Sequence, residues 1–204
     1  MSNAETITSD LTRSTEIDPG RMAELHNRLA AAAQREGVLD VAYRTVDSPV
    51  GPLLLAATDH GLIRVAYAVE DHDAVLQQLA DKVSPRILQA PARLDAVARE
   101  LDEYFTRARR TFDVPLDWRL AVGFRAAVLH HLPEIGYGQT ASYAAVAALA
   151  GSPRAVRAVG TACAKNPLPV VVPCHRVVRS DGGMGGYLGG PAAKRLLLDL
   201  EAAA

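Results

Sequence analysis

Residues 166–177 read Asn-Pro-Leu-Pro-Val-Val-Val-Pro-Cys-His-Arg-Val. The three valines at 170–172 lie between prolines, which predicts a short, buried, extended segment with rigid ends. This segment leads to Cys174, with His175 beside it. A cysteine is nucleophilic as its thiolate, and a neighbouring imidazole can take the thiol proton. A lone cysteine is more often a small buried hydrophobic side chain, so the rest of the chain must decide between the two interpretations.

The segment that follows Cys174 is a glycine-rich loop at 181–190. It lacks the Lys-Ser/Thr ending and the strand-to-helix context of a nucleotide-binding loop, so we reject that function. Its glycines would let backbone approach a flat ligand, with Tyr187 as the aromatic surface. The loop is therefore interpreted as a wall of a ligand pocket.

The last predicted helix begins at Pro191, and Glu201 lies one turn beyond Leu197 on the same side. A carboxylate on a leucine-rich face is costly unless it has a partner, and His175 is the candidate. The alternative is a solvated glutamate at a frayed helix end. Cys174, His175 and Glu201 could therefore act as a nucleophile, its base and the group that orients the base.

Upstream of the quoted stretch, two short helices joined by a tight turn predict a helix-turn-helix. Ser142 can cap a helix that runs through Leu149, and Gly151 can end it in the left-handed conformation. Ser152-Pro153 is a start signal for the second helix, with Ser as the cap and Pro at the first helical position.

The second helix has two contrasting faces at 100° per residue. Val156, Val159 and Cys163 fall on one face, which makes Cys163 a core residue and not a second reactive thiol. The opposite face is basic and is a candidate DNA-binding surface; it carries Arg154, Arg157, Thr161 and Lys165. A merely solvated charged face is the alternative.

The first half of the chain predicts a small α/β domain. Residues 1–17 look like a mobile tail, and a helical pattern then runs from Asp18-Pro19 to Gly37. Period-two segments follow and predict an antiparallel sheet, at 41–46, 52–57 and 62–68. Helical patterns come next, at 71–83 and 94–105, and 112–120 resembles a linker with a domain boundary near 118.

Composition sets broad limits on function. The 204 residues allow one domain or two small ones, and a net charge of −1 predicts no strong general attraction to nucleic acid. From Gly151 onward, however, seven Lys and Arg face three Asp and Glu, a local +4. The C-terminal third is therefore the part that could face an anion.

The two cysteines cannot form a disulfide framework, and a chain that uses a reactive thiol needs a reducing compartment. No apolar run approaches the length of a membrane span, and the N-terminus lacks a basic region followed by an apolar one. We expect a soluble, intracellular protein with no membrane partner.

Several motifs together resemble those of the O6-alkylguanine-DNA alkyltransferases, the methylated-DNA-protein-cysteine methyltransferases. They are PVVVPCHRV at 169–177, NP at 166–167, RAVG at 157–160, SY at 142–143 and GGYLGG at 185–190. The resemblance runs from about Val41 to Glu201. It implies a small ribonuclease-H-like α/β domain at 39–118 and an all-α helix-turn-helix domain at 119–204 that carries the active site, with an extra tail and helix at 1–38.

The resemblance also implies an activity. The chain would repair O6-alkylguanine in DNA, chiefly O6-methylguanine with O4-methylthymine as a second lesion, by direct, irreversible, stoichiometric transfer of the alkyl group to Cys174. It would work without a cofactor, as a monomer in free solution. Duplex DNA would be bound in the minor groove, with the damaged nucleotide rotated out of the stack.

The resemblance assigns roles to individual residues. Cys174 would be the acceptor, His175 the base acting through a water, Glu201 its orienting group, and Asn166 the residue that holds the active-site turn. Tyr143 would help to rotate the nucleotide. Arg157 would fill the gap that the nucleotide leaves.

The pocket residues follow in the same way. The carbonyls of Cys174 and Val177 would accept from the guanine amino group, and Pro169 and Tyr187 would pack around the base and its alkyl group. Relatives often have Ser after the loop tyrosine, and here the residue is Leu188, so only its backbone NH would bind the O6 atom. Some relatives bind a structural zinc in the N-terminal domain through Cys and His. No cysteine precedes Cys163 here, so we predict no metal.

Two other functions compete with repair. A lesion-binding or regulatory DNA protein could keep this scaffold without efficient transfer, although Cys174 excludes the relatives that carry Trp at the nucleophile position. A thiol hydrolase built on Cys-His-Glu would instead turn over repeatedly on an ester or amide.

Overall fold

A computed structural model describes residues 18–203, so the tail predicted at 1–17 lies outside the described residues. The described part divides into two units, which meet in the sequence between Leu39 and Asp40. The first unit contains helix α2, Pro19–Arg35, which confirms the predicted helix. The Asp18 carboxylate caps it by accepting from the amides of Gly20 and Arg21, at 3.1 and 3.3 Å.

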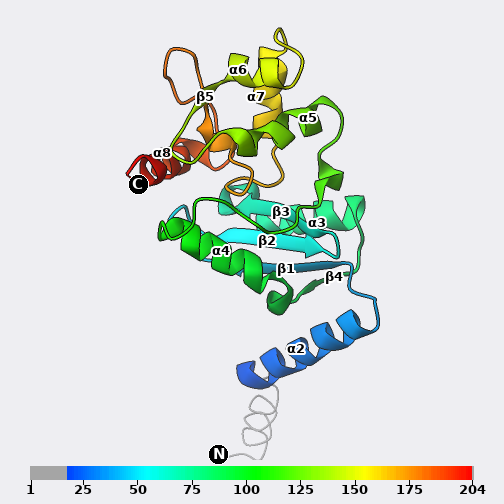
Figure 1. The fold of residues 1–204 in the computed structure, drawn as a ribbon. Coiled ribbons are helices and arrows are strands. Elements are labelled where there is room, and N and C mark those ends of the chain that lie inside the picture. Colours follow the sequence, from blue (N-terminus) through cyan, green and yellow to red (C-terminus); the bar gives the residue numbers. More distant parts are fainter. Residues whose placement is uncertain (1–17, 204) are drawn as a thin grey trace, which may run out of the picture. The chain divides into compact units, whose positions relative to one another are not determined.

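The second unit begins with a four-stranded sheet in the order β3-β2-β1-β4 (Figure 1). The strands are β1 Val41–Val46, β2 Leu53–Thr58, β3 Gly61–Tyr67 and β4 Ile87–Gln89. The first three pair antiparallel as predicted, but β4 pairs parallel with β1, so the sheet is mixed and not antiparallel. The chain reaches β4 from β3, at the opposite edge of the sheet, through the crossover helix α3, so β4 can run parallel to β1.

Helices cover the two faces of the sheet, with α3, His72–Lys82, on one and α4, Asp95–Phe105, on the other. Residues of β2 alternate between these layers: Leu54 belongs to the cluster with Leu79 of α3, and Leu55 to the cluster with Leu101 of α4. Short 3-10 turns precede the two helices, at Ala68–Glu70 and Pro91–Leu94.

Residues 112–120 are not a free linker. The backbone of this segment pairs with the edge of β3, because the Leu62 amide donates to the Pro115 carbonyl and the Asp117 amide to the Leu62 carbonyl, both at 2.8 Å. A side chain at Gly61, whose φ is +132°, would collide with the Pro115 carbonyl. The segment therefore extends the sheet before the 3-10 turn Trp118–Leu120.

The rest of the second unit is helical around one short parallel ladder. Its helices are α5 Phe124–His131, α6 Tyr143–Leu149, α7 Val156–Ala164 and α8 Gly190–Ala202. The ladder pairs β5, Ala141–Ser142, with β6, Val177–Val178, so this part is not purely α-helical as expected. Two 3-10 turns complete it, Leu132–Glu134 and Cys174–Arg176.

The helix-turn-helix forms with a later second helix than predicted. Ser142 Oγ caps α6 by accepting from the Ala145 amide at 3.1 Å, and Gly151 has φ +72°, both as expected. Ser152 does not cap α7, because its carbonyl accepts from the Ala155 amide at 2.8 Å and closes a separate turn. Because α7 begins only at Val156, that valine lies on the first turn and is 37% exposed, so its predicted core position is wrong.

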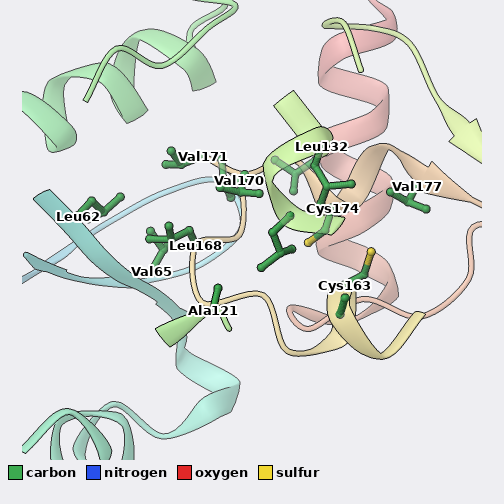
Figure 2. Packing of buried hydrophobic residues seen from close by; sticks show 14 of the residues in the cluster. Leu62, Val65, Ala121, Leu132, Cys163, Leu168, Val170, Val171, Cys174 and Val177 are labelled. Atoms are coloured by element: carbon green, nitrogen blue, oxygen red, sulfur yellow. The ribbon is translucent and has the colours of Figure 1, made fainter. Parts of the chain in front are cut away.

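The valines at 170–172 are buried but not extended. Val170 has φ +72°, and the Val172 amide donates to the Leu168 carbonyl at 2.8 Å, so the segment is a compact turn. A β-branched residue in the left-handed region costs about 1–3 kcal/mol. Figure 2 shows the turn in the same hydrophobic cluster as Val65 of β3, and burial there stabilises it.

Candidate active site

Cys174 begins the 3-10 turn that follows this compact turn, and it is only 2% exposed. Burial raises the pKa of its thiol to about 11, although the hydrogen bond from Asn166 and the charge of Lys194 act in the opposite direction. At neutral pH the sulfur is therefore a thiol. It needs a base that takes its proton when a substrate is present.

His175 lies beside the cysteine in a fully buried position, and its Nε2 is 2.9 Å from Glu201 Oε1. Burial lowers the pKa of the imidazole, and the hydrogen bond to Glu201 only partly offsets this effect. A neutral imidazole that donates from Nε2 keeps a free lone pair on Nδ1. That Nδ1 is buried without a hydrogen-bond partner among the described residues, which is the arrangement of a general base.

Glu201 is a buried carboxylate with five hydrogen-bond contacts, so the solvated alternative is wrong. Besides His175, it accepts from the Tyr104 hydroxyl at 2.7 Å, from Arg176 Nε and Nη2 at 2.9 Å each, and from the Gly138 amide at 3.1 Å. Burial alone would raise the pKa of Glu201, but the hydrogen bonds from His175 and Arg176 lower it to about 2. It is therefore an anion that fixes the tautomer of His175.

Asn166 lies directly after α7 and holds the turn that carries the cysteine. Its amide nitrogen donates to the Val172 carbonyl at 2.8 Å and to Cys174 Sγ at 3.2 Å, while its oxygen accepts from the Leu168 amide at 3.0 Å. We call this arrangement the Asn166 clasp. It fixes the position of the sulfur relative to the end of α7.

The glycine-rich loop lies against this centre. The Tyr187 ring meets the His175 ring edge to face, with centroids 6.4 Å apart, and its hydroxyl is 2.9 Å from that of Tyr67 on β3. Tyr143, at the start of α6, lies against the same loop: a Cβ at Gly185 would be 2.6 Å from the Tyr143 hydroxyl. Only glycine fits there, because φ is also +68°.

Three further predicted pocket residues have distinct environments. Pro169 is buried, and Leu188 is half-buried beside Tyr187 in the loop. The Val177 carbonyl already accepts from Lys194 Nζ at 2.6 Å, so one lone pair is left for a ligand. Lys194 itself is fully buried, and burial lowers its pKa.

A cavity of about 630 Å³ opens next to the clasp but does not include Cys174 among its lining residues. Its lining includes Leu188 from the loop, Lys165 and Asn166 from the end of α7, and Arg64 from β3. Most of its charged side chains are cationic. The cavity is lined by residues of β3 and α3 from the sheet domain and by the end of α7 from the helical domain.

The four predicted DNA-contacting side chains, of Arg154, Arg157, Thr161 and Lys165, are all exposed. The last three belong to α7 or its C-cap, and Arg154 precedes the helix. On the other side of α7, Val159, Ala162 and Cys163 are buried in the core. The helix therefore has one buried and one basic face, as the sequence indicates.

The sequence did not point to Tyr67, Tyr104, Arg176 or Lys194 as site residues. Arg176 stands inside the Cys-His-Arg-Val motif, which was the one available signal for it. The two tyrosines come from β3 and α4, so only the folded chain brings them to the site. Among residues 18–203, no three His, Cys, Asp or Glu side chains are grouped to hold a metal ion, and no helix could cross a membrane.

Two domains of one protein family account for most of the sequence. Residues 41–118 match the ribonuclease-like domain of 6-O-methylguanine DNA methyltransferase, and residues 123–203 match its DNA-binding domain. A methylated-DNA--protein-cysteine methyltransferase of Mycobacterium bovis is 39% identical over 161 residues, which are 79% of this chain and 92% of the relative. The constitutive enzyme of that name from Bacillus subtilis is 36% identical over 163 residues, which are 78% of this chain and 94% of the relative.

Solved structures agree with these sequence matches. The Mycobacterium tuberculosis O6-methylguanine methyltransferase superposes with a TM-score of 0.71 at 37% identity, covering 80% of this chain and 93% of that one. The M. tuberculosis protein OGT in complex with DNA gives a TM-score of 0.69 at 38% identity, covering 79% and 93%. Since both domains match over most of the described residues, the chain belongs to the 6-O-methylguanine DNA methyltransferase family.

Proposed function

We propose that this chain repairs O6-alkylguanine in DNA by transferring the alkyl group to Sγ of its own Cys174. O6-methylguanine is the principal lesion, and O4-methylthymine is a second. The observation that carries the proposal is the buried series of Asn166, Cys174, His175 and Glu201 within a helical DNA-binding domain. Membership of the methyltransferase family supports it.

The chemistry follows from the protonation states. His175 Nδ1 takes the thiol proton, directly or through one water, and Glu201 stabilises the imidazolium that forms. The thiolate attacks the alkyl carbon, the C–S bond forms and the C–O bond breaks. The electron pair stays on guanine, which takes up a proton.

The product limits the protein to one turnover. A thioether offers water no carbonyl to attack, so hydrolysis cannot regenerate the thiol. Cys163 cannot remove the alkyl group from Cys174, since burial raises the pKa of the Cys163 thiol to about 12 and its side chain is packed in the core.

DNA is the partner, bound through α6 and α7. We place α7 in the minor groove with the damaged nucleotide rotated out, a step that costs a few kcal/mol and least for a poorly paired base. Arg157 fills the vacated space in the duplex, and Tyr143 steers the nucleotide. Arg154, Thr161 and Lys165 contact the backbone.

In the pocket, the carbonyls of Cys174 and Val177 accept from the guanine amino group. Pro169 and Tyr187 pack around the base, and the Leu188 amide donates to the O6 atom. No cofactor takes part. A reactive thiol favours the reducing cytoplasm, and we propose that the protein is a monomer in free solution.

Mass spectrometry of the protein after incubation with O6-methylguanine duplex tests the proposal. One methyl group per molecule, mapped to Cys174, is expected in the wild type and in Cys163→Ser, and none in Cys174→Ser. Binding without any mass gain would favour a regulatory protein. Repeated turnover of an ester or amide would favour a thiol hydrolase.

A further inference from the structure

Tyr67 is the last residue of β3, and its side chain reaches the pocket wall from the ribonuclease-like domain. It is only 2% exposed, and its hydroxyl lies 2.9 Å from the Tyr187 hydroxyl. The two rings meet edge to face with centroids 5.8 Å apart. One buried hydroxyl pair therefore joins the sheet to the glycine-rich loop.

The Tyr67 ring also touches the loop a second time. A Cβ at Gly189 would lie 2.7 Å from the ring, so the loop backbone packs directly on it. The contacts with Tyr187 and Gly189 flank Leu188, whose amide we assign to the O6 atom. Tyr67 thus supports the loop on both sides of that amide.

The same strand also contacts the segment that leads to the cysteine turn. The Val65 amide and Arg64 Nη1 both donate to the Pro167 carbonyl, at 2.8 and 3.2 Å, next to the Asn166 clasp. Glu70 forms an ion pair with Arg64 and accepts from the Tyr67 amide at 2.9 Å. β3 therefore fixes the cysteine turn and the tyrosine of the loop relative to each other.

We propose that Tyr67 is a positioning residue that sets the width of the alkyl pocket and so favours methyl over bulkier O6 groups. The inference rests on the proposed function. Tyr187 cannot move away from the His175 ring without breaking its hydroxyl pair with Tyr67. A buried hydroxyl that loses its partner is costly, so the position of Tyr187 against His175 is the stable one.

The surroundings of the two phenols agree with this placement. Burial raises the pKa of both Tyr67 and Tyr187, although the hydrogen bond with Tyr187 acts in the opposite direction on Tyr67. Both hydroxyls therefore stay protonated near neutral pH and can share a hydrogen bond.

Tyr67→Phe removes one hydroxyl and keeps the ring that packs on Gly189. We would measure single-turnover transfer from duplexes that carry O6-methylguanine or O6-benzylguanine in the same sequence. The variant should lose about tenfold in rate on the methyl lesion and much less on the benzyl lesion. Tyr43→Phe is the matched control, because Tyr43 is a half-buried tyrosine on β1 in the other hydrophobic cluster; it should leave both rates unchanged.

A double-mutant cycle shows whether Tyr67 acts through Tyr187. Tyr187→Phe should lower the ratio of the methyl rate to the benzyl rate as much as Tyr67→Phe does. The double variant should lower this ratio no further. Equal losses on the two lesions, or independent effects of the two substitutions, would overturn the inference.

Urea unfolding of the same four proteins separates this inference from the proposed function. If the wild type transfers no alkyl group, the function fails, yet unfolding still reports whether positions 67 and 187 are coupled. If transfer occurs and the positions are not coupled, the inference fails and the function stands.

Discussion

At the scale of single residues, Glu201 is a carboxylate that burial would neutralise and that its neighbours keep ionised. Its pKa falls from an ordinary 4.5 to about 2 because His175 and Arg176 donate to it. A depressed pKa in the folded state contributes stability above pH 4.5 that is lost as pH falls toward 2. The contribution is about 3 kcal/mol, since each pKa unit corresponds to about 1.4 kcal/mol.

Glu201→Gln should therefore lower the free energy of unfolding at pH 7 by about 3–5 kcal/mol, because Arg176 is left buried without a counter-charge. The decline of stability between pH 4.5 and pH 2 should be smaller in this variant than in the wild type. Urea unfolding at several pH values measures both effects. Glu103→Gln, at a half-exposed ion pair with Arg109, should cost about 1 kcal/mol or less.

The Cys174 thiol should react slowly with a small alkylating reagent when no DNA is present. With a pKa of about 11, roughly one molecule in a thousand carries the thiolate at pH 8, so iodoacetamide should modify Cys174 about 200-fold more slowly than free cysteine. The rate should rise about tenfold per pH unit up to pH 10. Peptide mass spectrometry of Cys163→Ser gives the rate, and modification as fast as free cysteine would contradict the raised pKa.

At the scale of secondary-structure elements, the two faces of α7 have different roles: one packs in the core next to the active site, and the other is the proposed DNA-binding surface. Its buried face anchors the Asn166 clasp, and its exposed face carries Arg157 toward solvent. A residue that acts on the base stack matters only when a stack is present.

Arg157→Ala should lower single-turnover repair of a duplex at least tenfold and leave the reaction with free O6-benzylguanine within about twofold of wild type. Lys165→Ala, on the same face, should instead weaken duplex binding in a salt-dependent way. Equal losses of Arg157→Ala on duplex and free base would remove the proposed role of Arg157.

Elements with a local sequence signal could be predicted, and contacts between distant elements could not. The alternating pattern at 41–46 and the cap at Ser142 specify their own structure. β4, by contrast, has only three residues, which is too few to show a period. The start of α7 was placed too early because Ser152-Pro153 fits a turn as well as a helix cap.

The candidate site divides in the same way. Cys174, His175 and Asn166 lie within ten consecutive residues of one motif, so sequence reasoning could find them. The left-handed conformation of Val170 could not be predicted, because valine disfavours it and only the surrounding core stabilises it. Tyr67 and Tyr104 gave no local signal, since each serves the site only through long-range packing.

At the scale of the whole molecule, β3 connects the two matched domains at the site itself. The bonds from Val65 and Arg64 to Pro167 and the contact of Tyr67 with Tyr187 all run from the sheet to the helical domain. A change at the sulfur therefore acts on the junction between the domains and not only on its immediate neighbours.

Alkylation of Cys174 should destabilise the protein. A methyl group added to a packed position costs about 1–3 kcal/mol, and it disturbs the Asn166 clasp that donates to this sulfur at 3.2 Å. The Tm should fall by roughly 5 °C after stoichiometric reaction with O6-methylguanine duplex, measured by calorimetry once the DNA is removed. Protein incubated with unmodified duplex is the control, and an unchanged or higher Tm would contradict the expectation.

The clasp has a consequence for the fate of the protein in the cell. The Asn166 amide holds both the acceptor sulfur and the turn around it. An alkylated molecule is therefore expected to be less stable than an unreacted one. If alkylation lowers stability as expected, the spent protein unfolds more often and proteases degrade it faster than the intact protein. The number of intact molecules becomes a direct count of the lesions that the cell can still reverse.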